Sequence, residues 1–180
     1  MLRRVYSAMT VMIPFERAVE QHGATVLRVC RAVLGPGPDA DDAWSETFLA
    51  ALRAWDGLSE DTNVEAWLVR VAQRKAIDVT RARRRSAVPT ETLPEVEPDR
   101  RDPEADDTAL WVEVAALPDR QRLAVAYHYF GGLSHVETAA LTGSAPAAVR
   151  RAAADGIGKL RQRLTAGGTQ KGEPRGHEEK

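Results

Sequence analysis

A stretch of 23 residues with hardly any large apolar side chain, Ser86 to Thr108, divides this chain into two parts. It holds four of the ten prolines and eight acidic residues against two arginines. A segment of this composition cannot bury enough apolar surface to form a core, and its like charges repel one another. The sequence therefore predicts a flexible acidic linker over 86–108, with one small folded domain before it and another after it.

Before the linker, apolar residues recur at intervals of three and four, which is typical of amphipathic α-helices. The first predicted helix starts at Pro14, has its apolar positions between Phe15 and Leu34, and ends at Gly35-Pro-Gly-Pro38, which cannot continue a helix. A second is predicted over 41–55, with Asp39 as its N-cap. Its expected core-facing side carries Trp44, Phe48, Leu52 and Trp55. Acidic residues outnumber basic ones eight to one from 35 to 65, so this region is strongly acidic.

The third predicted helix, Glu65 to Arg85, is apolar on one side and basic on another. Its apolar stripe consists of Leu68, Val71, Ala72, Ala76 and Val79. From 66 to 85 there are seven Lys or Arg against one acid, and Trp67 lies one turn before Arg70. A cationic row beside a flat aromatic ring favours a nucleic-acid backbone. On this helix alone, a solvated face, an acidic protein partner or a membrane surface are the alternatives.

After the linker, a second apolar pattern starts at 109, is broken by Pro118 and ends at Gly131-Gly132. A short helix follows, with Ser134 as N-cap and Glu137 in the capping-box position. A Gly-containing turn at 142–144 leads to a last helix from Pro146. The core residues expected on that last helix are Val149, Ala153, Ile157, Leu160 and Leu164. A short helix, a tight turn and a longer helix are typical of a helix-turn-helix.

The whole pattern predicts an all-α protein with two small helical domains. The expected boundaries are an N-terminal extension over 1–13, a first domain over 14–85, the linker over 86–108, a second domain over 109–165 and a disordered tail over 166–180. The single cysteine, Cys30, is expected to be a buried free thiol. No apolar run is long enough to span a membrane and the start lacks the features of a signal peptide, which indicates a cytoplasmic protein.

Enzymatic chemistry has little support in the sequence. The four histidines are scattered, and none stands in a metal-ligand spacing. No glycine-rich phosphate loop or nucleophile motif is present. The sequence thus predicts a binding protein with no catalytic residue, no metal and no cofactor, and a small helical enzyme is the least favoured class.

Both parts resemble one family, the bacterial RNA polymerase sigma factors of the extracytoplasmic-function (ECF) type. The first part is similar to region two of that family at Asp39-Ala-Asp-Asp-Ala-Trp-Ser-Glu-Thr-Phe48, Ala66-Trp-Leu-Val-Arg-Val-Ala72 and Ala76-Ile-Asp-Val-Thr-Arg81. The second is similar to region four at Ala116-Leu-Pro-Asp-Arg-Gln-Arg122 and Tyr129-Phe-Gly-Gly-Leu-Ser-His-Val-Glu137. The resemblance implies a subunit that binds core RNA polymerase, at its clamp coiled coil and flap, and directs it to promoter DNA, which it helps to melt.

The resemblance also implies sites. The polymerase contacts would be Asp41, Asp42, Glu46, Phe48 and Leu49. The minus-ten element and the phosphates upstream of it would be held by Asn63, Trp67, Arg70, Arg74, Lys75, Arg81, Arg84 and Arg85. The minus-thirty-five element would be read by Ser144, Ala147, Ala148, Arg150 and Arg151. Control by an anti-sigma factor is common in the family, which makes such a protein a candidate partner.

The last helix departs from the family pattern. Where relatives usually carry further basic residues, this chain has Ala152, Asp155 and Ile157. Asp155 and Ala152 keep a second hypothesis open: a helix-turn-helix regulator, or a sigma-like protein that binds polymerase without initiating transcription.

Overall fold

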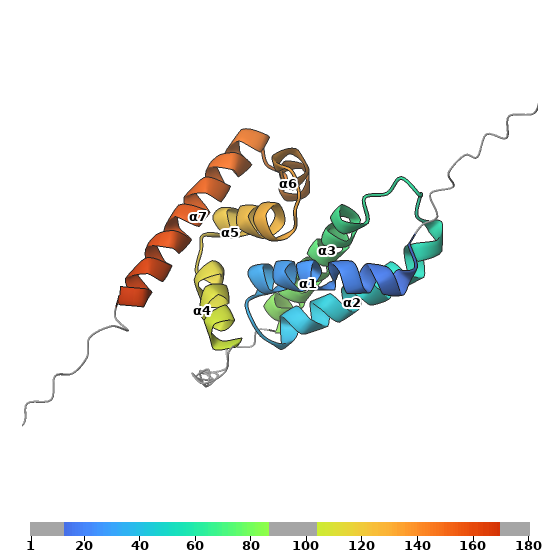
Figure 1. Ribbon diagram of the computed structural model, residues 1–180, viewed down its shortest axis with the longest axis horizontal. Coiled ribbons are helices and arrows are strands. Elements are labelled where there is room, and N and C mark those ends of the chain that lie inside the picture. Colours follow the sequence, from blue (N-terminus) through green and yellow to red (C-terminus); the bar gives the residue numbers. More distant parts are fainter. Residues whose placement is uncertain (1–12, 87–103, 170–180) are drawn as a thin grey trace, which may run out of the picture.

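A computed structural model of the chain describes residues 13–86 and 104–169 (Figure 1). The predicted N-terminal extension, most of the predicted linker and most of the predicted tail lie outside the described residues. Every regular element in the described part of the chain is helical, which confirms the all-α prediction. The elements are α1 (Phe15–Leu34), α2 (Pro38–Ala54), η1 (Trp55–Gly57), α3 (Val64–Ser86), α4 (Glu104–Ala115), α5 (Asp119–Ala124), η2 (Val125–Phe130), α6 (His135–Thr142) and α7 (Pro146–Thr169).

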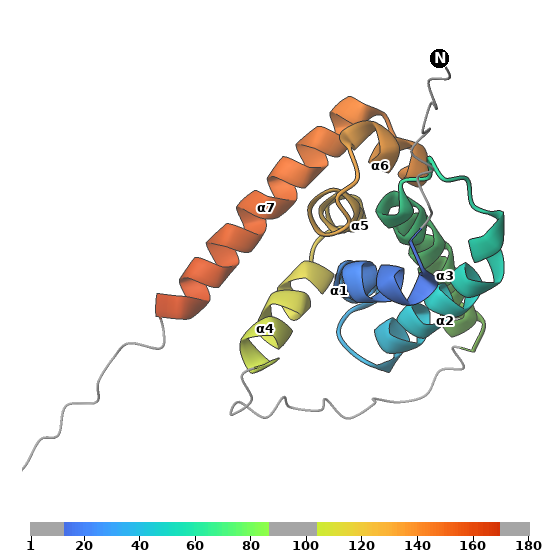
Figure 2. The same cartoon turned by 45° about the vertical axis from the view of Figure 1, so that its right-hand side comes forward.

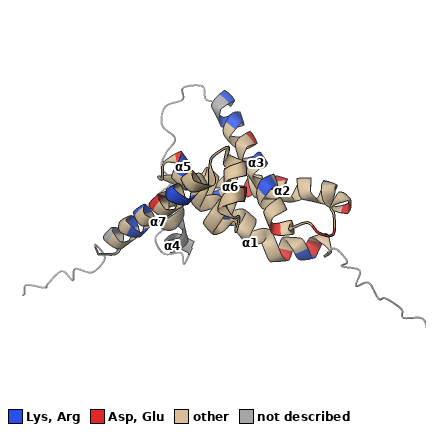
Figure 3. Cartoon of the chain, turned by 90° about the horizontal axis from the view of Figure 1, so that it is seen from above, with Lys and Arg blue, Asp and Glu red and all other residues tan. Residues whose placement is uncertain are grey.

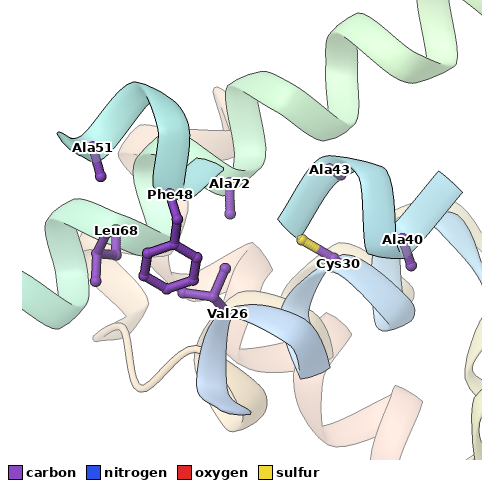
Figure 4. Close-up of a cluster of buried hydrophobic side chains, with 8 residues drawn as sticks. All are labelled: Val26, Cys30, Ala40, Ala43, Phe48, Ala51, Leu68 and Ala72. Carbon is purple, nitrogen blue, oxygen red and sulfur yellow. The ribbon is translucent and has the colours of Figure 1, made fainter. Parts of the chain in front are cut away.

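Helices α1, α2 and α3 enclose the core of the first half (Figure 4). The side chains of Val26, Phe48 and Leu68 point toward one another, one from each helix. The predicted apolar stripe of α3 faces this core, with Leu68 and Ala72 fully buried. Cys30 is a buried free thiol, as predicted. Burial, and second the nearby charge of Asp41, raise the pKa of this thiol to about 12, so it is protonated and unreactive at neutral pH.

Two predictions for α2 are wrong. Leu52 is 53% exposed instead of buried. The buried side of α2 is formed largely by small residues, including Ala40, Ala43 and Ala51, which let the helix lie close to its neighbours. Asp39 is not the N-cap, because the helix already begins at Pro38, whose fixed φ suits a first helical position.

The second half has its own core, built around α4, η2 and α7. Its buried members are Trp111, Val114, Leu117, Val125, Ala126 and Leu160, and Ala32 of α1 joins them. Tyr127 is buried whereas Tyr129, which belongs to the apolar pattern of the sequence, is 52% exposed. The π-helical geometry of η2 explains the difference, because a wider turn rotates each side chain away from the position that an α-helix would give it.

Two boundaries in the second half differ from the prediction. Helix α4 begins at Glu104, five residues before the expected start of the domain. Helix α7 continues to Thr169, past the expected end at 165. Leu164 was expected in the core but is 44% exposed, because it follows Leu160, the last residue of α7 in the buried cluster. Figure 2 shows this end of α7 projecting away from the other helices.

The two halves share a buried cluster, which the sequence did not predict. Val29 of α1 and Val69 of α3 meet Tyr127 and Leu133 of the second half. Gly131 lies at the closest approach: a Cβ atom there would be 2.9 Å from the Tyr127 carbonyl oxygen and within 3.2 Å of Val29 and Val69 side-chain atoms. A residue without a side chain is therefore required at this position.

Gly131→Ala is expected to lower the free energy of unfolding by about 1–3 kcal/mol, because the added methyl group must displace tightly packed atoms. The matched control is Gly57→Ala, where a Cβ meets nothing within 4 Å and stability should change little. Urea denaturation followed by circular dichroism measures both variants. Equal stability of the two variants would contradict the packing described for Gly131.

Candidate nucleic-acid interface

Helix α3 presents its basic residues on the side away from the first core. Arg70, Arg74, Arg81 and Arg85 are exposed, and Lys75 is half-buried. The side chain of Arg84 lies outside the described residues. Figure 3 shows Lys and Arg gathered toward the C-terminal end of α3. The structure thus brings most of the predicted cationic residues of the first half onto one helix surface.

Acidic residues of α2 neutralise part of this surface. The Nζ atom of Lys75 lies 3.2 Å from a carboxylate oxygen of Glu46, and Arg83 pairs with Asp39. The charge separation seen in the sequence is therefore partly satisfied between the neighbouring helices α2 and α3. Each pair has one exposed partner, Glu46 in the first and Arg83 in the second, so each contributes little to stability.

Asn63 and Trp67, at the start of α3, have structural roles in this conformation. The side-chain oxygen of Asn63 accepts a hydrogen bond from the Ala66 amide at 3.0 Å, which caps the helix. The ring of Trp67 is half-buried and packs edge-on against Trp55, with ring centroids 6.2 Å apart. Both residues lie at the end of α3 that is nearest α6 (Figures 1 and 2).

The predicted polymerase-contacting residues on α2 fall into two groups. Asp41, Asp42, Glu46 and Leu49 are exposed, and Leu49 keeps 47% of its surface in solvent. Phe48 is only 7% exposed and packs against the rings of Phe15 and Trp44. The outer face of α2 therefore combines carboxylates with an exposed leucine, while Phe48 supports that face from within the core.

Helices α6 and α7 form the predicted helix-turn-helix. Ser134 and Glu137 make both bonds of a capping box: the Ser134 amide donates to Glu137 Oε2 at 2.9 Å, and the Glu137 amide donates to Ser134 Oγ at 3.2 Å. The two capping-box hydrogen bonds also lower the pKa of Glu137, with a further contribution from Arg70. After α6 the chain turns at Gly143, whose φ of 64° is a left-handed backbone conformation that glycine adopts readily.

The N-terminal end of α7 is open to solvent. Ser144, Ala147, Arg150 and Arg151 are exposed, and Ala148 is half-buried. Ala152 and Ile157 are turned toward the cores of the second half, where they pack as partly buried residues. Of the three departures from the family pattern, only Asp155 is therefore on the exposed side of the helix.

The structure also brings together two of the histidines that are scattered along the sequence, His128 and His135. The rings of His128 and His135 lie with their centroids 3.9 Å apart, and the Leu133 carbonyl accepts a hydrogen bond from His128 Nδ1 at 2.7 Å. Desolvation, then His128 and Arg150, lower the pKa of His135. The signal in the sequence was the Gly131-Gly132 turn, which folds the chain back between the two rings.

Within the described ranges, no helix is long and apolar enough to cross a membrane. The same residues contain no group of three or more His, Cys, Asp or Glu side chains placed to hold a metal ion.

Comparison with known families accounts for both halves. Residues 18–86 match Sigma-70 region 2, and residues 108–160 match Sigma-70, region 4. The ECF RNA polymerase sigma factor SigD of Mycobacterium tuberculosis is 35% identical over 155 residues, which is 79% of this chain and 73% of that protein. The RNA polymerase sigma-E factor of Streptomyces avermitilis is 28% identical over 85% of this chain and 86% of its own length.

Solved structures show the same fold. CnrH, in complex with the cytosolic domain of CnrY, superimposes with a TM-score of 0.59 at 25% identity, covering 84% of this chain and 88% of that one. The sigma factor RpoE from Bartonella quintana, in complex with the anti-sigma factor NepR, gives a TM-score of 0.66 at 18% identity, covering 84% of this chain and 96% of that one.

A basic helix on a three-helix core, followed by a helix-turn-helix, defines a two-domain helical DNA-binding protein. The family matches make the class specific: this chain belongs to the RNA polymerase sigma factors of the ECF type. It binds core RNA polymerase and promoter DNA and acts in transcription initiation.

Glu137→Gln tests the electrostatic part of the capping box. The folded-state pKa of Glu137 is lowered, so its charged form stabilises the fold at neutral pH, and this contribution is lost as the pH falls through the folded-state pKa. The variant should be less stable than the wild type at neutral pH, and the difference should shrink on acidification. Exposed Glu60→Gln, in the loop before α3, is the control. Thermal melts of all three proteins over a pH series measure the effect, and a pH-independent difference for Glu137→Gln would contradict it.

Proposed function

We propose that the two halves engage two separate promoter elements: α3 binds the melted minus-ten region and α7 reads the minus-thirty-five element. The exposed row of arginines on α3, together with the exposed N-terminal end of α7, is the observation that carries this proposal. Once one half is bound, the connection between them raises the effective concentration of the other half at its own element. Two individually weak sites can then give useful occupancy.

On α3, the arginines would hold the DNA backbone. Arg70, Arg74 and Lys75 are proposed to lie along the melted strand, and Arg81, Arg84 and Arg85 to contact phosphates upstream. Contacts to phosphate position the protein but do not distinguish bases. A protein that melts DNA also needs a surface for unstacked bases, and the half-buried Trp67 beside Asn63 is the proposed surface.

On α7, the residues proposed to face the major groove are Ser144, Ala147, Ala148, Arg150 and Arg151. Arginine can donate two hydrogen bonds to guanine, and an alanine methyl group can contact the thymine methyl group. Because Ala152 and Ile157 point inward, their apolar character is explained by packing. This supports DNA reading by the exposed face. It also weakens the argument for the non-initiating alternative that came from Ala152, whereas Asp155, the other residue that suggested this alternative, is exposed.

On α2, we propose that Asp41, Asp42, Glu46 and Leu49 contact the clamp coiled coil of polymerase. Carboxylates around an exposed leucine suit a partner helix with basic and apolar residues. Phe48 is proposed to shape this face from beneath, because its ring is buried. The second half is proposed to contact the flap.

We further propose that the chain acts in the cytoplasm, that it has no catalytic activity of its own, and that an anti-sigma protein controls it. This is supported by the structure of the sigma factor RpoE, which is in complex with the anti-sigma factor NepR, and CnrH is in complex with the cytosolic domain of CnrY.

Run-off transcription from a genomic promoter library, with core polymerase and this protein, tests the proposed function. Arg150→Ala/Arg151→Ala should reduce specific transcripts at least about tenfold, because each lost base contact costs about 1–3 kcal/mol of discrimination. Arg161→Ala, an exposed arginine nearer the C-terminal end of α7, is the control and should retain activity.

Two outcomes would contradict the proposal. Wild-type activity of the double variant would show that α7 does not read DNA through these arginines. Binding to core polymerase without any specific transcript would favour the non-initiating alternative.

A further inference from the structure

We propose that His128 and His135 form a phosphate-binding pair in the helix-turn-helix half, and that the pair takes up one proton when it contacts the backbone of promoter DNA. The ligand is a phosphate group of the DNA at the edge of the groove that α7 is proposed to enter. This inference rests on the proposed function and deepens it. It adds a DNA contact that depends on pH, which the contacts of the α7 arginines do not.

The two rings come from different elements and meet at the surface of the second half. His128 lies in η2, and His135 is the first residue of α6. The ring centroids are 3.9 Å apart and the ring planes are inclined by 31°, so the rings are stacked. Both residues are half-buried, and the neighbouring Val136 is 65% exposed. A ligand in solution can therefore reach the pair.

The arrangement of α6 and α7 places the pair beside the proposed path of the DNA backbone. In a helix-turn-helix the second helix enters the major groove, and the first helix crosses the backbone next to it. Here α7 is the second helix, and α6 is the first (Figures 1 and 2). Arg150, which is proposed to face the groove, is close enough for its charge to act on His135. A phosphate at the edge of that groove would lie near the pair.

The hydrogen bond of His128 explains why a proton is needed. A carbonyl oxygen can only accept, so His128 Nδ1 must donate to the Leu133 carbonyl at 2.7 Å. Its Nε2 atom then carries a hydrogen only when the ring is charged, and an ionised phosphate oxygen accepts hydrogen bonds. Two charged rings 3.9 Å apart would repel each other, so the pair holds a single proton near neutral pH.

The free pair is mostly uncharged at neutral pH. Desolvation first, and then the nearby His128 and Arg150, lower the pKa of His135 below its ordinary value. A DNA phosphate beside the pair would favour the charged form and raise its pKa. Phosphate binding and proton uptake thus strengthen each other.

The other charges around the pair leave room for a phosphate. The titratable and charged groups are Tyr129 of η2, whose ring contacts His128, Glu137 of α6, Arg150 of α7, and Arg70 and Glu65 of α3. Both carboxylates already have partners. Glu137 accepts from the Ser134 amide and lies 3.5 Å from Arg70, and Glu65 lies 3.2 Å from His22. Arg150 remains to attract the phosphate.

Promoter binding by the holoenzyme over a pH series tests the pair. The dissociation constant of a labelled promoter duplex, taken from the run-off library, is measured by fluorescence anisotropy at constant salt. Affinity should rise roughly fivefold to tenfold between about pH 8 and about pH 6, because binding takes up one proton. The gain is complete below the pKa of the free pair and is lost as the pH rises through the pKa of the bound pair.

The double variant His128→Gln/His135→Gln should bind like the wild type at about pH 8 and lose most of the gain at about pH 6. His135→Lys carries a permanent charge, so at about pH 8 it should bind as the wild type does at about pH 6. The control is His22→Gln, which removes the histidine paired with Glu65 in the first half and should keep the wild-type profile. Circular dichroism checks that each variant is folded. A wild-type pH profile for the double variant would overturn the proposal, and so would wild-type affinity of His135→Lys at about pH 8.

Salt dependence distinguishes a phosphate contact from a purely structural role. Loss of one phosphate contact lowers the slope of log affinity against log salt concentration by about 0.9. The double variant should show this lower slope at about pH 6 and the wild-type slope at about pH 8. A wild-type slope at both pH values would contradict the phosphate contact.

An unrelated duplex, measured in the same series, separates this inference from the proposed function. Phosphates are the same in every sequence, so the pH effect of the pair should appear on both duplexes. Equal wild-type affinity for the two duplexes would refute the proposed function. A pH effect that the double variant retains on either duplex would refute the pair alone, and the unrelated duplex decides the pair even if the library yields no promoter.

Discussion

The burial of α1 on two sides is the constraint on which the rest of the structure depends. Val26 and Cys30 face α2 and α3 in the first core, whereas Val29 and Ala32 face the second half. An α-helix makes this arrangement simple, because residues three and four apart share a side and the intervening ones point elsewhere. Helix α1 thus fixes where α3 lies relative to the helix-turn-helix, and so determines which charged residues remain open to solvent.

Much of the fold could be predicted because the helices carry long periodic patterns and clear end signals. Helix α1 begins one residue after the predicted start at Pro14 and ends at Leu34, directly before the glycine that was predicted to stop it, and α6 has the predicted capping box. The contact between the halves could not be predicted, because the apolar patterns that include Val29 and Val69 indicate burial but not which distant residues cover these side chains. Gly131, at the closest approach, gives no hydrophobic signal at all. The prediction that Leu52 faces the core was wrong because alanines, which give a weak hydrophobic signal, form much of the buried side of α2.

The candidate site was predictable as a set of charges but not as a set of interactions. Sequence alone placed an acidic helix before a basic one, and the structure shows that Glu46 and Asp39 of α2 pair with Lys75 and Arg83 of α3. Which arginines are engaged depends on distant partners, as the pairing of Arg70 with Glu137 shows. Under the proposed function, binding to DNA would exchange these carboxylate partners for phosphates, and it should weaken with rising salt.

The most direct test of this account joins the two halves chemically and asks whether the joined chain initiates transcription. Gln73→Cys and Thr142→Cys, two positions that line the same cavity, can be linked by a reducible crosslinker. Because the two halves are proposed to engage two separate promoter elements, the linked chain should produce no specific transcript with core polymerase, and reduction of the crosslink should restore transcription. Specific transcription by the linked chain at the level of the reduced chain would contradict it.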